Sequence, residues 1–197
     1  MKIYIAERRN IRTGKEKEQF IRECLADFSP IDRKQTEKAE FCREPGGRPY
    51  LAGVKMEFSL SHSGEYIGCA VSPYRIGFDL QEIRPANFHG IAKRFFSKEE
   101  QLYLEKFGES RFFSLWSRKE AFVKCTGRGM AQGFSSFSTV KDGRLSAVLS
   151  APENPEQEYR IRELEIMPGF CAAVCIPNRG QEAEEELRGA RIVNAGK

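Results

Sequence analysis

The sequence predicts an α+β protein made of two similar α+β halves, and three observations predict it. Strand-like alternation of apolar and polar residues recurs on both sides of segments with helical spacing. The segment "GEYIGCAVS" at 64–72 resembles "GFCAAVCIP" at 169–177, a similarity that indicates a duplication or arises by chance. The 197 residues suffice for one buried domain or for two small halves with a shared core. We expect an N-terminal half at 1–76, a C-terminal half at 77–180 and a polar tail at 181–197, frayed or disordered.

Composition limits the function classes. Apolar residues make up 40% and charged residues 30%, as in folded soluble enzymes or binding domains. The 32 basic and 28 acidic residues leave +4 without a long basic run, which argues against a nucleic-acid partner and suits an anionic small ligand. No segment has the roughly 20 apolar residues of a membrane span, and the opening apolar segment is too short for a secretory signal. We therefore expect a cytoplasmic monomer without a membrane partner.

The cysteines favour buried free thiols. They are scattered without a CxxC pair, and the chain has only two histidines, so neither a zinc site nor a disulfide framework is expected. The six positions are Cys24, Cys42, Cys69, Cys125, Cys171 and Cys175.

Elements of the N-terminal half follow from local patterns. "MKIYIAE" alternates as a strand does, and "EKEQFIRECLADF" has helical spacing. "CREPGGRPYL" is dense in glycine and proline and predicts a loop. "MEFSLSHSGEYIGCAVS" predicts a pair of strands around "SHSGE".

The C-terminal half opens with another strand, in "YRIGFDLQEIRP". "FSKEEQLYLEKFG" predicts a helix, because Ser97 and Glu100 have the spacing of a capping box. A second helix is expected at about 110–126, capped by Gly127. "FSTVKDGRLSAVLS", with a turn at Asp142-Gly143, and "YRIRELEIMPGFCAAVCIP", with a turn at Pro168-Gly169, predict further strands.

The segment "LWSRKEAFVK" carries the first candidate site. Lys119 falls in the middle of an apolar stripe of the expected helix, with Glu120 beside it and Lys124 one turn further. A surface helix would explain this as a Glu120–Lys124 pair contributing about 0.3 to 0.5 kcal/mol, with Lys119 reaching past the aromatic residues to water. Desolvation argues for the alternative, because a lysine on an apolar stripe needs an anionic partner. Carboxylate and amines together are what a metal–phosphate site requires.

Other segments supply possible partners. Asp79 and Gln81 share one face of the expected strand, although an aspartate also commonly caps a strand end. Ser61 and His62 could contact phosphate oxygens, or His62 could simply be hydrogen-bonded in a loop. In the loop "GGRPYL", glycines permit close approach of a ligand and the arginine fork matches phosphate, although a plain surface turn explains the segment too.

Taken in order, six segments resemble the surfactin-type 4′-phosphopantetheinyl transferases: "GGRPYL", "FSLSHS", "IGFDLQE", "IAKRFFSKEE", "FFSLWSRKEAFVKCTGRGM" and "FSSFSTVKDG". The resemblance implies a pseudo-dimer of two α+β halves with the coenzyme between them. It implies magnesium-dependent transfer of the phosphopantetheine arm of coenzyme A to a serine of an apo acyl or peptidyl carrier protein, in fatty acid, polyketide or nonribosomal peptide biosynthesis. The other product would be adenosine 3′,5′-bisphosphate.

The resemblance also implies residue roles. Asp79 and Glu120 are the expected metal ligands, and Glu120 or a water on the metal would take the serine proton. Lys124 is the expected pyrophosphate contact, supported by Lys119. The expected adenine and 3′-phosphate contacts are Gly47, Arg48, Pro49, Ser61 and His62.

Two features depart from the family pattern. Gln81 stands where many relatives carry an acid, so it would bind Mg²⁺ weakly or through water. The N-terminal half is shortened, and Arg33, Lys34, Lys38 and Arg43 are candidate replacements for its missing coenzyme contacts. These departures motivate an alternative, a non-catalytic module that binds coenzyme A or a carrier protein. A generic polyphosphate or nucleic-acid binder would rest on the net charge alone.

Overall fold

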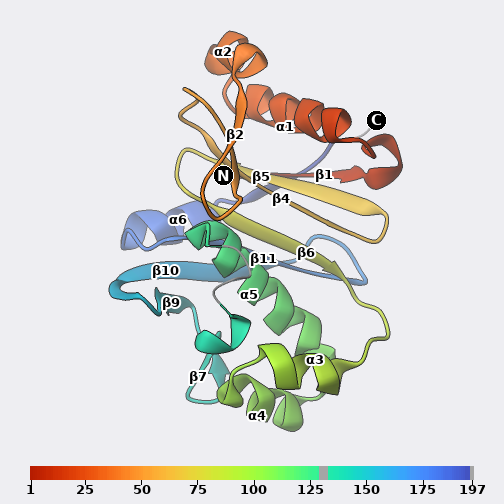
Figure 1. Ribbon diagram of the computed structural model, residues 1–197, viewed down its shortest axis with the longest axis vertical. Coiled ribbons are helices and arrows are strands. Elements are labelled where there is room, and N and C mark those ends of the chain that lie inside the picture. The colour runs from red at the N-terminus through yellow and green to blue at the C-terminus, as the bar shows by residue number, and fades with distance from the viewer. Residues whose placement is uncertain (129–132, 196–197) are drawn as a thin grey trace.

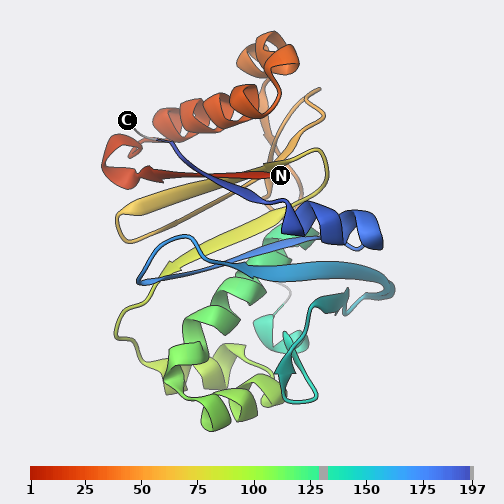
Figure 2. The same ribbon diagram turned by 180° about the vertical axis from the view of Figure 1, so that it is seen from behind.

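The computed structural model describes residues 1–128 and 133–195 and contains two four-stranded sheets. Helix α1 (Gly14–Phe28) lies on the outer face of the first sheet and α5 (Phe112–Thr126) on the outer face of the second (Figures 1 and 2). An apolar cluster between the sheets joins them.

The first sheet has the order β12-β1-β5-β4. Its strands are β1 (Lys2–Glu7), β4 (Glu57–Ser63), β5 (Tyr66–Ser72) and β12 (Arg191–Asn194). β5 is antiparallel to β1 and β4, whereas β12 is parallel to β1. The predicted strand pair around "SHSGE" is therefore confirmed.

The second sheet has the order β6-β11-β10-β9 and is antiparallel throughout. Its strands are β6 (Gly77–Glu82), β9 (Val148–Ala151), β10 (Asn154–Leu164) and β11 (Phe170–Pro177). β6 begins at the predicted division between the halves, so the change of sheet falls there.

Two helices and a hairpin pack beyond the second sheet, namely α3 (Phe88–Phe95), α4 (Lys98–Phe107) and the pair β7 (Val140–Lys141) and β8 (Arg144–Leu145). The predicted capping box is present: the Ser97 hydroxyl accepts from the Glu100 N–H, and the Glu100 carboxylate accepts from the Ser97 N–H. The turn at Asp142-Gly143 joins β7 and β8 with both residues at positive φ.

Serine hydroxyls connect the two sheets. Ser59, Ser61 and Ser63 on β4 accept hydrogen bonds from alternate N–H groups of β6 at 2.9, 3.3 and 2.9 Å. Because strand side chains alternate between faces, "SLSHS" directs all three hydroxyls to the same side. Polar side chains thus bridge β4 and β6 where no backbone ladder is formed.

The two sheets share a connectivity: a strand, an outer helix and an antiparallel hairpin. Cys69 of β5 contacts Cys24 of α1, and Cys175 of β11 contacts Cys125 of α5. The repeat seen in the sequence aligns Cys69 with Val174, which faces the other sheet. Matching the faces shifts the alignment by one residue, to Cys175. This correspondence supports the pseudo-dimer, which stays a prediction.

The prediction of a frayed or disordered tail is wrong for most of that segment. Helix α6 (Gln181–Arg188) buries Ala183 and Leu187 in the core between the sheets, and β12 then pairs with β1. The segment is polar overall, and its apolar face consists of only two residues four positions apart, so its composition does not indicate a buried helix. The strand with which β12 pairs, β1, lies at the other end of the chain.

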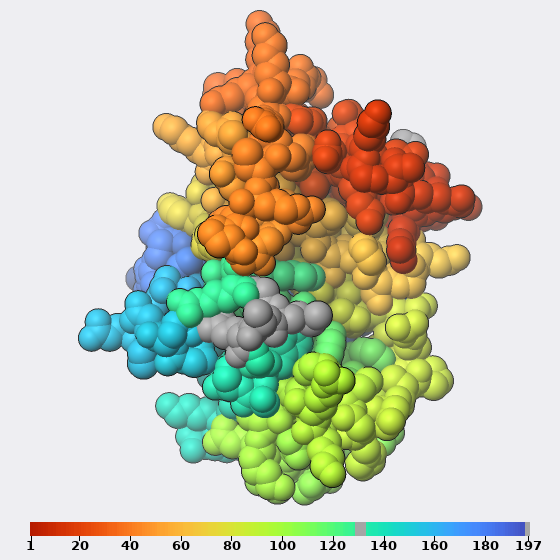
Figure 3. Space-filling view, in the orientation of Figure 1, coloured from red at the N-terminus to blue at the C-terminus, as the bar shows by residue number. Residues whose placement is uncertain are grey.

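The predicted loop "CREPGGRPYL" contains a short hairpin, β2 (Phe41–Arg43) and β3 (Pro49–Leu51). Helix α2 (Arg33–Lys38) precedes it at the end of the molecule remote from α5 (Figures 1 and 2), in the orange part of the surface at the top of Figure 3. Among the described residues, no helix has the length and apolar character needed to cross a membrane.

Candidate active site

Asp79 lies at the centre of a hydrogen-bond network that joins β4, β6 and α5. Its side chain, on β6, is only 2% exposed. One carboxylate oxygen accepts from the Lys124 ammonium and from the Ser61 hydroxyl, both at 2.6 Å. The other oxygen accepts from the Gln81 amide nitrogen at 2.7 Å. The predicted shared face of Asp79 and Gln81 is therefore observed, and Ser61 holds Asp79 in place.

Glu120 lies beside this network on α5, one turn before Lys124. Burial, together with the negative charge of Asp79, raises the pKa of Glu120, and the positive charge of Lys124 opposes the rise. No hydrogen bond or ion pair to the Glu120 carboxylate occurs within residues 1–128 and 133–195. A desolvated carboxylate without a donor is poised to accept a proton or to bind a cation.

Lys119 does not reach this site. It is fully buried, donates to the Glu100 carboxylate and the Phe137 carbonyl at 2.7 Å each, and lies over the Phe137 ring. The buried lysine on the apolar stripe does have the anionic partner that desolvation demands, but the partner is Glu100. A pyrophosphate contact does not fit this position, so we correct the expected role of Lys119 to fixing α5 against α4.

Trp116 contributes packing near the start of α5. Its ring stacks on Phe112 at 5.9 Å and meets the rings of Phe95 and Phe134. This aromatic cluster holds the helix that presents Glu120 and Lys124.

The hairpin tip between β2 and β3 forms the other wall of the site. Gly47 has φ +85°, and its N–H donates to the Glu44 carbonyl across Pro45 and Gly46, as in a type I turn followed by a left-handed glycine. A pocket of about 230 Å³ lies between this tip and α5. Its lining includes Gly47, Arg48, Pro49, Glu120 and Lys124, so the structure brings together segments separated by about 70 residues.

Arg48 is turned inward instead of presenting its fork to a ligand. Its guanidinium donates to Glu57 at 2.6 Å and to the carbonyls of Phe58 and Ile76 at 3.1 Å. The side chain is 5% exposed, and its buried Nε lacks a partner among the described residues. Arg48 therefore lines the pocket while its charge is largely neutralised within the protein.

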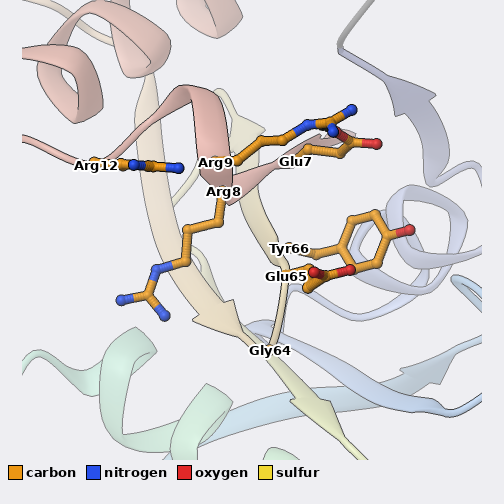
Figure 4. Close-up of a pocket in the computed structure, with 7 residues that line it drawn as sticks. All are labelled: Glu7, Arg8, Arg9, Arg12, Gly64, Glu65 and Tyr66. Atoms are coloured by element: carbon orange, nitrogen blue, oxygen red, sulfur yellow. Dashed lines mark ion pairs between the residues drawn. The ribbon is translucent and has the colours of Figure 1, made fainter.

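His62 lies at the turn end of β4. Partial burial lowers its pKa, and so do the positive charges of Arg8, Lys17 and Lys124. Arg8 follows β1, where its N–H donates to the Glu65 carbonyl, and its side chain extends away from the Glu7–Arg9 ion pair (Figure 4). Sequence reasoning missed Arg8 and Lys17, because only the folded chain places them near His62.

The basic residues suggested from the sequence are placed differently. Arg33, Lys34 and Lys38 belong to α2, remote from α5. Arg43 donates to the Gly47 carbonyl at 2.8 Å and so supports the hairpin tip.

The donor set suits Mg²⁺. Within the described part of the chain no cluster of three or more histidine, cysteine or acidic side chains could hold a metal ion. Mg²⁺, however, is commonly held by one or two carboxylates together with waters and substrate phosphates. Asp79 and Glu120 are close enough for the charge of one to raise the pKa of the other, and a divalent cation would relieve that repulsion. The Gln81 oxygen is a third candidate donor.

The fold and the site define an α+β protein with a pair of carboxylates and a lysine beside a pocket between the β2–β3 hairpin tip and α5. A sequence model of the 4′-phosphopantetheinyl transferase superfamily matches residues 75–175. The chain belongs to this superfamily.

Curated relatives support that assignment. The 4′-phosphopantetheinyl transferase Sfp of Bacillus subtilis (strain 168) is 34% identical over 174 residues, which are 81% of this chain and 75% of Sfp. The transferase psf-1 of Bacillus pumilus is 36% identical over 144 residues, 71% of this chain and 61% of psf-1. The transferase gsp of Aneurinibacillus migulanus is 29% identical over 139 residues, 68% of this chain and 57% of gsp. The chain thus spans about three fifths to three quarters of these proteins.

Proposed function

We propose that this protein transfers the 4′-phosphopantetheine arm of coenzyme A to a serine of an apo carrier protein. The observation that carries the proposal is that Glu120 and Lys124 line a pocket whose opposite wall is the Gly47–Pro49 segment, with Asp79 paired to Lys124 beside it. The pyrophosphate of coenzyme A is charged and needs cations beside it, which one side of the pocket would supply. The adenosine end of the coenzyme needs a surface to pack on, which the opposite side of the pocket would supply. The family membership and the names of the relatives support the same activity.

The chemistry assigned to the chain's residues follows from their surroundings. Glu120 accepts the proton of the serine hydroxyl, because it is a carboxylate in the pocket lining to which no described residue donates a hydrogen bond. The serine oxygen bonds to the β-phosphorus, and the bond from that phosphorus to the oxygen bridging to the α-phosphorus breaks. Adenosine 3′,5′-bisphosphate leaves. Lys124 neutralises charge on the pyrophosphate.

Magnesium would be held by Asp79 and Glu120, with Gln81 as a further oxygen donor. When bound, the ion neutralises charge that develops on the phosphate oxygens. Ser61 holds Asp79 in the orientation needed for this role, instead of contacting the 3′-phosphate itself.

Arg8 and Lys17 are proposed to replace the coenzyme contacts of the shortened N-terminal half. Together with Lys124 they lower the pKa of His62 through their charges, so a positive potential surrounds that imidazole. The 3′-phosphate of coenzyme A is a dianionic group that such a potential would attract.

The carrier would approach along α3, in the segment "FHGIAKRFF", because of the position of this segment in the family. A cleft of about 300 Å³ between α3 and α4 is lined by Phe88, Ala92 and Leu104. We expect the protein to act as a monomer on a carrier of fatty acid, polyketide or peptide synthesis.

Carrier labelling tests the proposal. Incubation with coenzyme A, Mg²⁺ and an apo carrier should raise the carrier's mass by one phosphopantetheine, and a chelator should prevent the increase. Several carrier classes are needed, because the preferred carrier is unknown. Binding of coenzyme A without a mass gain on any of them would favour the non-catalytic binding module.

A further inference from the structure

The hairpin tip that forms one wall of the pocket rests directly on the carboxyl end of α5. A Cβ atom added to Gly46 would lie 1.7 Å from the Gly127 carbonyl oxygen. Gly127 itself caps α5 with φ +77°, and a Cβ there would lie 2.1 Å from the Arg75 guanidinium. Only glycine fits at both positions, so the hairpin and the helix end are in backbone contact.

Arg75 and Glu44 bridge this contact. The two Nη atoms of Arg75 donate to the two carboxylate oxygens of Glu44 at 2.8 and 2.6 Å, the bidentate geometry that arginine favours. Arg75 Nε and Nη2 also donate to the carbonyls of Cys125 and Thr126 at 2.6 and 3.2 Å. These carbonyls belong to the last turn of α5, where a cation offsets the helix dipole.

The bridge connects three parts of the chain. Glu44 begins the hairpin tip, Arg75 precedes β6, and the accepting carbonyls end the helix that carries Glu120 and Lys124. The Glu44 carboxylate also lies 3.6 Å from the Arg48 guanidinium in the pocket wall. The hydrogen bonds and charge of Arg75 hold the pKa of Glu44 below its ordinary value, so the carboxylate stays ionised at neutral pH.

We propose that Glu44 and Arg75 are positioning residues that fix the distance between the Gly47–Pro49 segment and Lys124, and thereby set the affinity for the adenosine bisphosphate part of coenzyme A. This inference rests on the proposed function. Neither side chain lines the pocket, so both act through the backbone they hold. A ligand that contacts both walls gains affinity when the walls are already in place.

The test compares Glu44→Gln and Arg75→Lys with the wild type. Glu44→Gln keeps the shape of the side chain but removes one charged acceptor, and Arg75→Lys keeps the charge but cannot reach four acceptors at once. Each variant should bind adenosine 3′,5′-bisphosphate and coenzyme A about tenfold more weakly by calorimetry, equivalent to about 1.4 kcal/mol. In carrier labelling, KM for coenzyme A should rise while kcat changes by less than about twofold. Amide hydrogen exchange should quicken across residues 41–51.

Glu186→Gln is the matched control, because Glu186 also pairs with an arginine, Arg179, at 2.6 Å, but does so on α6 away from the pocket. Equal weakening of coenzyme A binding by Glu186→Gln and Glu44→Gln would overturn the positioning role, and so would unchanged affinity in Glu44→Gln. If the wild type binds neither ligand, the proposed function fails with the inference. If the wild type binds both and the variants match it, the positioning role alone fails.

Discussion

The Lys124 ammonium and the Asp79 carboxylate form a 2.6 Å ion pair at the edge of the pocket. Asp79 is nearly buried whereas Lys124 is 28% exposed, so the lysine is the partner that can leave. Asp79 is a proposed magnesium ligand, and in this structure the Lys124 ammonium is paired with it in place of the metal ion. Binding of coenzyme A and Mg²⁺ should therefore exchange one cation for another at Asp79, with Lys124 moving to the pyrophosphate.

Lys124→Ala should change the affinity for Mg²⁺ and the affinity for coenzyme A in opposite directions. Without the competing ammonium, Asp79 should bind Mg²⁺ more tightly in the absence of coenzyme A. Coenzyme A should bind more weakly, because one pyrophosphate contact is lost. Calorimetric titration with each ligand alone gives both values. Weaker Mg²⁺ binding would contradict the exchange and point to a merely structural ion pair.

Glu120→Gln tests the proposed base. The amide keeps the size of the side chain but cannot accept a proton, so transfer should fall by about two to four orders of magnitude, the usual contribution of a general base. Coenzyme A binding should persist, which separates a catalytic defect from a binding defect. Single-turnover carrier labelling at saturating coenzyme A measures the rate. An unchanged rate of transfer would show that Glu120 is not the general base.

The same variant should remove a pH dependence of the unfolding free energy in the metal-free protein. Because burial raises the pKa of Glu120, the folded state binds the proton more tightly than the unfolded chain. This contribution to stability is fully present below the ordinary glutamate pKa and is lost as pH rises through the raised value. Glu120→Gln should therefore be more stable than the wild type at pH 8, and the difference should shrink toward pH 4. Chemical unfolding at both pH values, with chelator present, measures it.

The positions of several candidate site residues could be predicted from the sequence, because these residues lie on regular elements with visible start, stop and period signals. The capping box at Ser97, the cap at Gly127 and the period of β6 located α4, α5 and the face of Asp79. The partner of Lys119 could not be predicted, because the sequence pattern around Glu100 indicates only a capping box. Its carboxylate both caps α4 and accepts from Lys119 and Thr139. The sequence does not show that a single carboxylate accepts hydrogen bonds from several distant donors, because only the folded chain brings those donors together.

The parts that could not be predicted depend on distant pairing. β12 takes its place beside β1 although nearly the whole chain separates them, and the proximity of Arg8 and Lys17 to His62 depends on the β1–β5–β4 order. Local periodicity contains no information about either arrangement. The shift of the internal repeat by one residue has a similar origin, since only the faces of β5 and β11 show which cysteines correspond.

Gln81→Glu should strengthen metal binding while disturbing Asp79. The Gln81 amide donates to Asp79 at 2.7 Å, and a carboxylate there would repel Asp79 unless a cation lies between them. The variant should therefore bind Mg²⁺ more tightly but be less stable without it. Thermal unfolding with and without Mg²⁺ should show a larger metal-induced stabilisation than in the wild type. An equal or smaller stabilisation would indicate that Gln81 does not adjoin the metal position.

His62 should take up a proton when coenzyme A binds. Partial burial and positive neighbours lower its pKa in the free protein, so it is mostly neutral at pH 7, and a nearby 3′-phosphate would raise that pKa again. Affinity should therefore increase as pH falls from about 7.5 toward 6. Calorimetry in buffers of different ionisation enthalpy counts the protons. His62→Gln and 3′-dephospho-coenzyme A should each abolish the uptake, and uptake that survives His62→Gln would assign the proton to another group.

Lys119→Met distinguishes the two roles considered for this lysine. Methionine fills similar space but leaves the Glu100 charge buried without its cation, so unfolding free energy should fall by about 3 to 5 kcal/mol. Adding Glu100→Gln should recover part of the loss, because the remaining buried group is then neutral. At a temperature where the single variant stays folded, coenzyme A affinity should match the wild type, since Lys119 lies outside the pocket. If the variant kept its stability but bound coenzyme A more weakly, Lys119 would instead be a contact to the pyrophosphate.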